Sequence, residues 1–425
     1  MNRHIYTLLF YILIPVICLR MIWRSVKEPS YMANPGQRFG FAPRMKGPVI
    51  WIHAVSAGES IAAFPMIEEL LSGLPGYSIL VTNMTPTGRE RVISRYKDNS
   101  RVVQSYAPWD LSGAVSRFIK RVRPELLVIV DTELWPNYLH VCKRNNIKSI
   151  LVNGRLSERS ARGYARVPSL TRQMLSDLAA VAVQSESQGE RFIHLGLDRE
   201  KLFNTGSIKF DLGIPEDLAQ KAVAYRKILG ADRKVMVAAS THPGEEDIIL
   251  KTFIDANNIH PETILVLAPR HPHRFAEVEQ LLVGREIEYE RFSRGNTCGV
   301  DCKVLLVDTI GELLYFYSLA DIAFVGGSLV PVGGHNLMEA AVFGVPILMG
   351  KHLQNIEDIA GEFVRENALE LVDETSFYEK LSDFMANPDK RKAAGEAALH
   401  VMKKNQGALS RVVELLYSNL GPYDR

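Results

Sequence analysis

Short apolar runs alternate with longer amphipathic stretches over most of the chain. In the first half these runs are rich in valine, isoleucine and leucine. They lie at residues 49–55, 78–84, 126–131, 149–154 and 181–185. Runs of this kind, separated by helix-length segments, are typical of parallel strands that helices cover on both faces. The first half is therefore predicted to be a doubly wound α/β domain.

The alternation pauses at residues 206–216, a stretch with Gly206, Gly213 and Pro215 that is predicted to be a linker. It then restarts, and the second set of apolar runs lies at residues 235–240, 264–269, 304–308, 322–327 and 346–350. The pattern predicts two Rossmann-like domains, at 29–205 and 217–400. We expect them to face each other, with a ligand cleft at the carboxyl ends of the strands.

The N-terminus carries an apolar run at residues 5–19, which continues past Arg20. The run has about 15 residues where roughly 20 span a bilayer, so it would just span with Arg20 reaching the interface. Basic residues are more numerous after the run than before it, which places the main body in the cytoplasm. Residues 1–28 are therefore predicted to be a membrane anchor. A secretory signal peptide and a buried helix are the alternatives, although no small-residue cleavage site follows.

Composition and charge limit the kinds of partner that the chain is expected to bind. The chain has 425 residues, which favours two domains, and 50 basic against 48 acidic residues give a net charge of +2. There is no charge excess and no motif that would favour nucleic acid. The four cysteines are scattered, and their spacing fits neither a zinc site nor a disulfide framework. No metal is predicted.

Two loops that follow strands in the first half carry carboxylates. Glu59 stands where a strand turns into a helix, and it would accept a proton from a hydroxyl in the cleft. Ser56 and Glu59 also have the spacing of a capping box, which would only satisfy backbone donors. Glu133 follows the run at 126–131, and here too a helix start, with Thr132 as its cap, is the alternative.

Two loops of the second half combine small, basic and imidazole groups. Ser240 and His242 lie in residues 240–246, which are predicted to cradle a phosphate at a helix start. Pro269 and Arg270 open the next loop, which is rich in arginine and histidine. No Walker or G-x-G-x-x-G signature occurs, so a P-loop or a plain dinucleotide site is not supported.

The loop at residues 326–339 is the densest in glycine. Gly333 and Gly334 are predicted to open a helix whose N–H groups would suit a phosphate. Asn336 and Glu339 are then expected on one face of its first turns, where the carboxylate would accept hydrogen bonds from ribose hydroxyls. A loop that only turns the chain is the alternative.

A glycine-rich loop before a helix with a glutamate, in the second of two Rossmann-like halves, resembles the nucleotide-sugar site of GT-B glycosyltransferases. Six segments in order more narrowly resemble the 3-deoxy-D-manno-octulosonic acid (Kdo) transferase family of lipopolysaccharide biosynthesis. They are HAVSAGE (53–59), TELWPN (132–137), GSIKFD (206–211), STHPGEE (240–246), PRHPHR (269–274) and GGHNLME (333–339). The resemblance runs from about residue 30 to the end, and its order makes it specific.

The resemblance implies transfer of Kdo from CMP-Kdo to the 6′-hydroxyl of a lipid A precursor, lipid IVA, with inversion and without a cofactor. It implies that Glu59 is the general base and Glu133 a second essential carboxylate. The residues that would hold CMP are Pro269, Arg270, Asn336 and Glu339. Lys209 and Arg270 are the candidates to pair with the carboxylate of Kdo.

The resemblance also bears on location. It fits an N-terminal anchor at the cytoplasmic face of the inner membrane, in contact with membrane lipids. In GT-B proteins the last helices return to the first domain, so residues 401–425 are expected to cross back. Two other functions stay open. A UDP-hexosamine 2-epimerase shares this plan but needs no anchor, and a non-catalytic lipid A-binding membrane protein would need no intact carboxylates.

Overall fold

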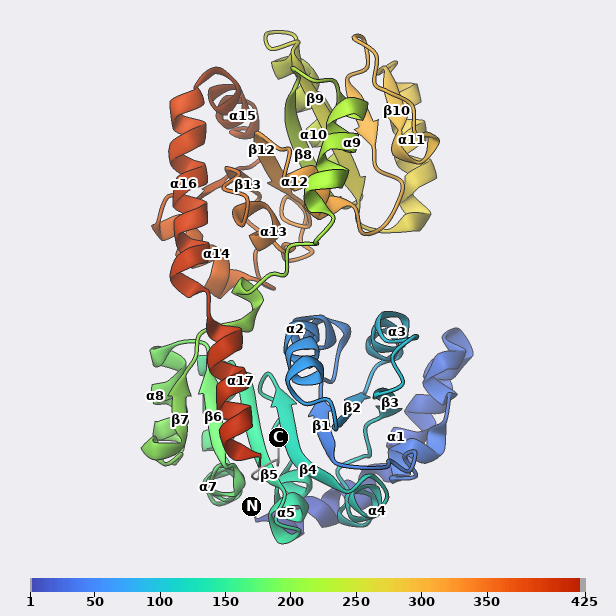
Figure 1. Ribbon diagram of the computed structural model, residues 1–425, viewed down its shortest axis with the longest axis vertical. Coiled ribbons are helices and arrows are strands. Elements are labelled where there is room, and N and C mark those ends of the chain that lie inside the picture. The colour runs from blue at the N-terminus through green and yellow to red at the C-terminus, as the bar shows by residue number, and fades with distance from the viewer. Residues whose placement is uncertain (1, 421–425) are drawn as a thin grey trace. The chain divides into compact units, whose positions relative to one another are not determined.

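The computed structural model describes residues 2–420, and these form two units (Figure 1). The first unit holds the chain up to Asp211 and again from Gln406 onward, and the second is Leu212–Asn405. The change of unit falls inside the stretch 206–216 that the sequence marks as a linker. The chain returns to the first unit at Gln406, five residues after the predicted position, residue 401. Residues 421–425 of that predicted segment lie outside the described part of the chain.

The first unit is built on a parallel sheet in which the chain order reverses once. Its seven described strands are ordered β3-β2-β1-β4-β5-β6-β7. They are β1 (Val49–His53), β2 (Ser78–Asn83), β3 (Val102–Tyr106), β4 (Pro124–Val130), β5 (Lys148–Gly154), β6 (Ala180–Val183) and β7 (Leu202–Asn204). The central strands are buried along their whole length, as their continuous apolar runs predict.

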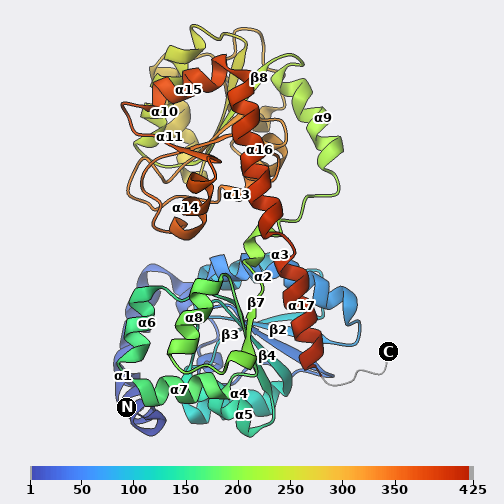
Figure 2. The same ribbon diagram turned by 90° about the vertical axis from the view of Figure 1, so that its left-hand side faces the viewer.

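Helices cover both faces of this sheet. One face packs against α2 (Ala57–Gly73), α3 (Pro86–Arg95) and α17 (Ala408–Asn419). The other packs against α4 (Ser112–Val122), α5 (Pro136–Arg144), α7 (Pro168–Asp177) and α8 (Glu186–His194). The short α6 (Glu158–Ala165) contacts α7 and α8 on this side (Figure 2). The chain's final described helix therefore completes the core of the first unit.

The second unit repeats the architecture. Its described strands are ordered β10-β11-β9-β8-β12-β13-β14, and all pairs are parallel. They are β8 (Lys234–Thr241), β9 (Thr263–Pro269), β10 (Tyr289–Arg291), β11 (Val304–Leu306), β12 (Ile322–Val325), β13 (Ile347–Met349) and β14 (Leu369–Leu371). The α/β fold with two doubly wound domains is thereby confirmed.

The helices of the second unit also lie on both sides of its sheet. One core contains α10 (Glu245–Asn257), α11 (Phe275–Gly284) and α15 (Phe377–Ala386). The remaining helices are α9 (Leu218–Leu229), α12 (Leu313–Tyr317), α13 (Met338–Ala341), α14 (Glu357–Arg365) and α16 (Pro388–Asn405). Of these, α12 contacts β8 and α16 contacts β13.

The N-terminal run forms one long helix, α1 (Arg3–Lys27), on the outside of the first unit (Figure 1). Phe10, Ile14 and Met21 pack against Trp109 and Leu111, so one side of the helix is docked on the protein. The other side exposes large apolar residues; these include Leu8, Ile12, Val16 and Leu19. By length and composition, with a mean hydropathy of 2.2, α1 is long and apolar enough to cross a membrane.

Candidate active site

Several predicted site residues follow the strands at which each sheet reverses its order. In the first unit β1 and β4 are neighbours, and Glu59 and Glu133 follow these two strands. In the second unit β8 and β12 are neighbours, and the loops with Ser240 and the paired glycines follow them. At such a reversal the loops after adjacent strands leave in opposite directions and open a crevice for ligands.

Glu59 lies in the first turn of α2 with both carboxylate oxygens held by hydrogen bonds. The Val55 N–H donates to Oε2 at 2.6 Å, and the Ser56 hydroxyl donates to Oε1 at 2.7 Å. Ser56 also caps α2 by accepting from the Glu59 N–H at 3.4 Å. The capping arrangement therefore exists, but each carboxylate oxygen accepts only one of these bonds. A second lone pair on each stays available to an approaching hydroxyl.

Two further carboxylates, Glu133 and Asp131, interact electrostatically with Glu59 or with each other. Burial, and next the charge of Glu59, raise the pKa of Glu133 from 4.5 to about 7. Burial is also the main cause that raises the pKa of Glu59, while the bonds from Ser56 and Val55 oppose it. Asp131 adds a smaller upward effect on both carboxylates. Since like charges disfavour joint ionisation, the negative charge of Glu59 makes Glu133 harder to ionise.

Asn153, at the end of β5, links this cluster to the predicted Lys209. Its amide donates to Asp131 Oδ1 at 2.6 Å, and its carbonyl oxygen accepts from the Ile208 N–H at 3.3 Å. Burial raises the pKa of Asp131, and the charge of Lys209 opposes that rise. Lys209 is thus near enough to Asp131 for its charge to act on that carboxyl. Asn153 and Asp131 both have left-handed backbones, with φ of 54° and 57°, a strained conformation that clusters at functional sites.

Four predicted residues of the second unit surround one cavity of about 230 Å³. They are Ser240, Pro269, Arg270 and Glu339. Burial raises the pKa of Glu339, opposed by a hydrogen bond from Asn336 and by the charge of Arg270. The cavity therefore holds a carboxylate and a guanidinium near each other, with apolar side chains around them.

The predicted helix at Gly333 is wrong. Residues 332–337 are a loop, and α13 starts only at Met338. Asn336 lies ahead of the helix, where its side chain accepts from the Met338 N–H at 3.1 Å and donates to Glu339 at 3.0 Å. The two residues still meet, but Asn336 orients the carboxylate from the loop. Its amide competes with helix formation, which residue spacing alone does not reveal.

The expected phosphate cradle is occupied by the protein itself. The N–H groups of Gly333 and Gly334 donate to the Gly327 carbonyl at 2.9 and 2.6 Å. Glu245 is fully buried, and its carboxylate accepts from the N–H groups of Gly327, Ser328 and Leu329 at 2.7, 2.9 and 2.9 Å.

The same carboxylate accepts from the His242 N–H at 2.9 Å. An internal anion thus organises the loop, and these donors are not free for a ligand. Gly326 fits here because an added Cβ would lie 2.5 Å from the Ser240 carbonyl oxygen. The acidic residues of STHPGEE are visible in the sequence, but their role is not, because the amides that Glu245 binds lie far along the chain.

Two imidazoles pair in the loops that follow β8 and β12. His242 Nε2 and His335 Nε2 are 2.7 Å apart, and their rings stack at a centroid distance of 5.0 Å. Burial, and next the charge of Arg270, lower the pKa of His335 to about 4. At neutral pH this ring is therefore uncharged, and one imidazole of the pair donates to the other.

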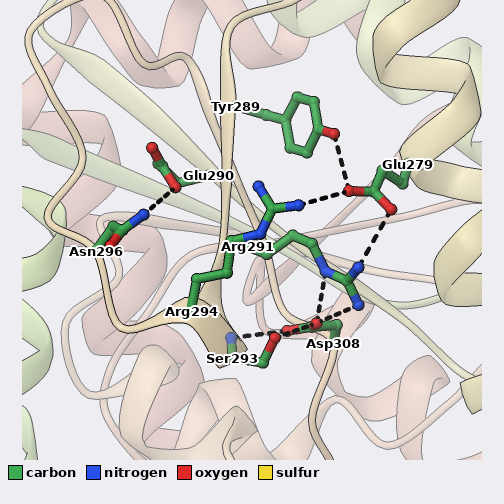
Figure 3. Close-up of polar contacts among 8 residues, drawn as sticks. All are labelled: Glu279, Tyr289, Glu290, Arg291, Ser293, Arg294, Asn296 and Asp308. Atoms are coloured by element: carbon green, nitrogen blue, oxygen red, sulfur yellow. Dashed lines mark hydrogen bonds and ion pairs between the residues drawn. The ribbon is translucent and has the colours of Figure 1, made fainter.

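Asp308 joins Arg291 and Ser293 in a polar cluster beside the cavity of about 230 Å³ (Figure 3). Its carboxylate accepts from Arg291 Nε at 2.8 Å and from the Ser293 N–H and hydroxyl at 2.9 and 2.6 Å. Burial alone would raise the pKa of Asp308, but Ser293 and Arg291 outweigh it and hold the pKa below its usual value. The next residues, 309–311, line the cavity. The sequence analysis assigned no role to Asp308 or Arg291.

No group of three or more histidine, cysteine, aspartate or glutamate side chains within residues 2–420 is arranged to hold a metal ion.

Comparison with known proteins adds the family. The family model described as 3-deoxy-D-manno-octulosonic-acid transferase (kdotransferase) matches residues 33–212. A 3-deoxy-D-manno-octulosonic acid transferase of Haemophilus influenzae is 38% identical over 421 residues, which cover 98% of each chain. The transferase of Bordetella pertussis is 34% identical over 440 residues, covering 99% of this chain and 100% of that protein.

The fold has solved counterparts as well. A UDP-GlcNAc 2-epimerase from Neisseria meningitidis, solved with UDP-GlcNAc, matches with a TM-score of 0.60, covering 87% of this chain and 100% of that one. At 13% identity this likeness concerns the fold alone.

Two Rossmann-like units, together with these relatives, define a glycosyltransferase of the GT-B type. The chain belongs to the 3-deoxy-D-manno-octulosonic acid transferase family, and it is a Kdo transferase.

Proposed function

We propose that this protein transfers Kdo from CMP-Kdo to the 6′-hydroxyl of a lipid A precursor, lipid IVA, and inverts the anomeric centre. The observation that carries the proposal is Glu59, held by Val55 and Ser56 at the sheet reversal of a Kdo transferase. A carboxylate fixed in this way, with lone pairs to spare, suits a general base.

The chemistry needs one base and a stable leaving group. Glu59 takes the proton of the acceptor hydroxyl while its oxygen bonds to the anomeric carbon of Kdo. The bond from that carbon to the phosphate oxygen breaks, and CMP leaves with the electron pair. A single displacement of this kind inverts the centre. The transition state resembles an oxocarbenium ion, as in glycoside hydrolysis.

The environment of the two glutamates favours Glu59 as the base. Its carboxylate accepts two strong hydrogen bonds, which stabilise the ionised form, whereas Glu133 has a pKa of about 7. The proton that the pair retains therefore resides on Glu133. Lys209, beside Asp131, supplies a positive charge for an anionic group of a substrate.

The cavity with Ser240, Pro269, Arg270 and Glu339 is the proposed site of the nucleotide. Glu339, oriented by Asn336, is suited to accept from ribose hydroxyls, and Arg270 is suited to the phosphate charge of the leaving group. No cofactor is required beyond the donor substrate. His242, two residues after the cavity-lining Ser240, is also assigned to the proposed donor site.

The acceptor is a lipid, and α1 suits a membrane enzyme. Its exposed apolar side supports anchorage, and the basic residues after the run support a cytoplasmic position at the inner membrane.

The test is incubation of the purified protein with CMP-Kdo and lipid IVA, with mass spectrometry of the lipid and assay of CMP. We expect a mass gain of one or more Kdo residues with equimolar CMP, and NMR of the product to report an inverted linkage. A non-catalytic binder would release no CMP. An epimerase would act on a UDP-hexosamine and leave the lipid unchanged.

A further inference from the structure

A cavity of about 290 Å³ lies in the first unit between α1 and the loops after β2 and β3. Its basic lining residues are Arg20 and Arg24 from α1 and Arg38 from the following segment. The remaining lining is mostly apolar and aromatic; it comprises Ile17, Met21, Tyr31, Met84, Thr85 and Trp109. The cavity is separate from the one proposed for the nucleotide, which lies in the second unit.

Arg38 is a buried cation without an anion. Its side chain is 3% exposed, donates to the Met84 carbonyl at 3.3 Å and lies over the Tyr106 ring at 4.2 Å. Its Nε is buried and has no hydrogen-bond partner. A buried guanidinium normally pairs with a carboxylate, because desolvation of an unpaired charge is costly.

Arg20 and Arg24 are exposed, and they also have no carboxylate partner among the described residues. Arg24 donates to the Tyr31 hydroxyl at 3.4 Å, a weak bond to a neutral group. The nearby Glu28 accepts from Ser30. Within residues 2–420, no ion pair is found for Arg20, Arg24 or Arg38. Three arginines thus line one cavity without a carboxylate partner in the described part of the chain.

The cavity is joined to the proposed base through one residue. The Val55 N–H donates to Glu59, and the Val55 carbonyl accepts from the N–H groups of Met84 and Thr85 at 3.0 and 3.3 Å. Met84 and Thr85 line the cavity. On its other side the cavity borders α1, where Val16 and Leu19 are 60% and 66% exposed. An anionic head in the cavity would therefore have its acyl chains beside an apolar surface and its sugar near Glu59.

We propose that Arg20, Arg24 and Arg38 form a binding site for a phosphate group of the lipid acceptor. Arginine is suited to phosphate because its planar fork makes paired, charge-assisted hydrogen bonds. The site would fix the acceptor's sugar relative to Glu59 and so position the hydroxyl that reacts. The inference rests on the proposed function, since it assigns a recognition element to that acceptor.

The test uses the full chain with Arg20→Gln and Arg24→Gln combined, because both side chains are exposed and their loss leaves the fold intact. The KM and kcat are measured in neutral micelles for the phosphorylated lipid and for the same lipid after phosphatase treatment. We expect the double variant to raise KM for the phosphorylated lipid by roughly ten-fold or more, with kcat little changed. The KM for the dephosphorylated lipid should not change.

Arg172→Gln, an exposed position on α7, is the matched control and should behave as wild type. Equal effects of the double variant on both lipids, or no effect, would overturn the site. An equal loss of sedimentation with phosphatidylglycerol vesicles would instead assign the arginines to bulk lipid. Calorimetric binding of both lipids is measured in parallel. If wild type transfers to neither lipid, the proposed function fails, while phosphate-dependent binding still decides the site.

Discussion

Two glutamates of the same type acquire different proton affinities from their surroundings. Burial raises the pKa of both, but at Glu59 it is opposed by hydrogen bonds at 2.6 and 2.7 Å, while at Glu133 it is reinforced by the charge of Glu59. The pair is therefore poised to hold one proton near neutral pH, with Glu59 as the ionised partner. This division of roles is what a reaction with a single base requires.

Glu133→Gln should stabilise the protein in a pH-dependent way. The folded-state pKa is about 7 against 4.5 in the unfolded chain, so the folded state retains a proton that the unfolded state has lost in this window. Stability of the wild type therefore falls as pH rises from about 4.5 to 7. The variant should gain on the order of 1–3 kcal/mol at pH 8 and clearly less at pH 5. Thermal unfolding at both pH values measures this, and an equal gain at both would contradict it.

The position of a residue could be predicted from the sequence where its neighbours in the chain determine it. The role of a residue whose partners lie far along the chain could not. Glu59 follows a buried strand and a capping serine, so its place in a strand-to-helix loop could be inferred from its neighbours. Glu245 looks like any acidic residue of a first helical turn, yet its carboxylate binds amides at Gly327 to Leu329, far along the chain. Asn153 likewise acts through Asp131 and Ile208.

At the scale of elements, the strands that the sequence does not reveal are those at the sheet edges. The apolar runs predict the ten inner strands of the described chain, while β3, β7, β10 and β14 were missed. Each missed strand borders only one other strand and is partly exposed, so it needs no continuous apolar run. The burial that creates the sequence signal is absent at these positions.

Asp308 holds the edge strand β10 through its bond to Arg291, the last residue of that strand. Asp308→Ala removes the bonds to Ser293 and one of the two carboxylates that pair with Arg291, the other being Glu279, which should cost on the order of 1–3 kcal/mol. The adjacent residues 309–311 line the proposed nucleotide cavity, so CMP affinity should also fall. Thermal unfolding and CMP titration measure the two effects. Asn296→Ala, at an exposed residue that bonds to Glu290 outside this network (Figure 3), should change neither. Unchanged CMP affinity in Asp308→Ala would contradict the positioning role.

The final residue of the segment GSIKFD, Asp211, has a structural role. The Asp211 carboxylate accepts from the N–H groups of Gly407 and Leu409 at 2.7 and 2.6 Å, so it caps α17 in place of a residue of that helix. Arg411 adds bonds to the Thr205 carbonyl at 2.9 and 2.7 Å. The first unit thus binds its own C-terminal helix through a segment that the sequence analysis predicted to be a linker, with a substrate role for Lys209 and none for Asp211.

Asp211→Ala should therefore destabilise the first unit by about 1–2 kcal/mol, because an N-terminal cap and a charge favourable to the helix dipole are lost. Asp211→Asn keeps an acceptor and should lose less. Hydrogen exchange of the amides of α17 measures the effect, which should be confined to the first unit. If α17 exchanges in the Ala variant as in wild type, the capping role is refuted.

At the scale of the whole molecule, each unit carries its chemistry at the reversal of its own sheet. Carboxylates stand after β1 and β4, and a cavity with Arg270 and Glu339 forms beside the strands β8 and β9. The general plan was predictable because loops after parallel strands are where polar groups gather. The docking of α1 was not, since an apolar run looks the same whether one side packs on protein or all sides face lipid.

The central claim is that Glu59 is the base of a Kdo transfer. Its most direct test measures transfer from CMP-Kdo to lipid IVA by wild type, Glu59→Gln and Glu69→Gln, an exposed control on the same helix. The account predicts that Glu59→Gln lowers kcat by roughly 10²–10⁴-fold with CMP affinity unchanged, and that Glu69→Gln matches wild type. Transfer by Glu59→Gln at the wild-type rate would contradict it and reduce Glu59 to a cap of α2.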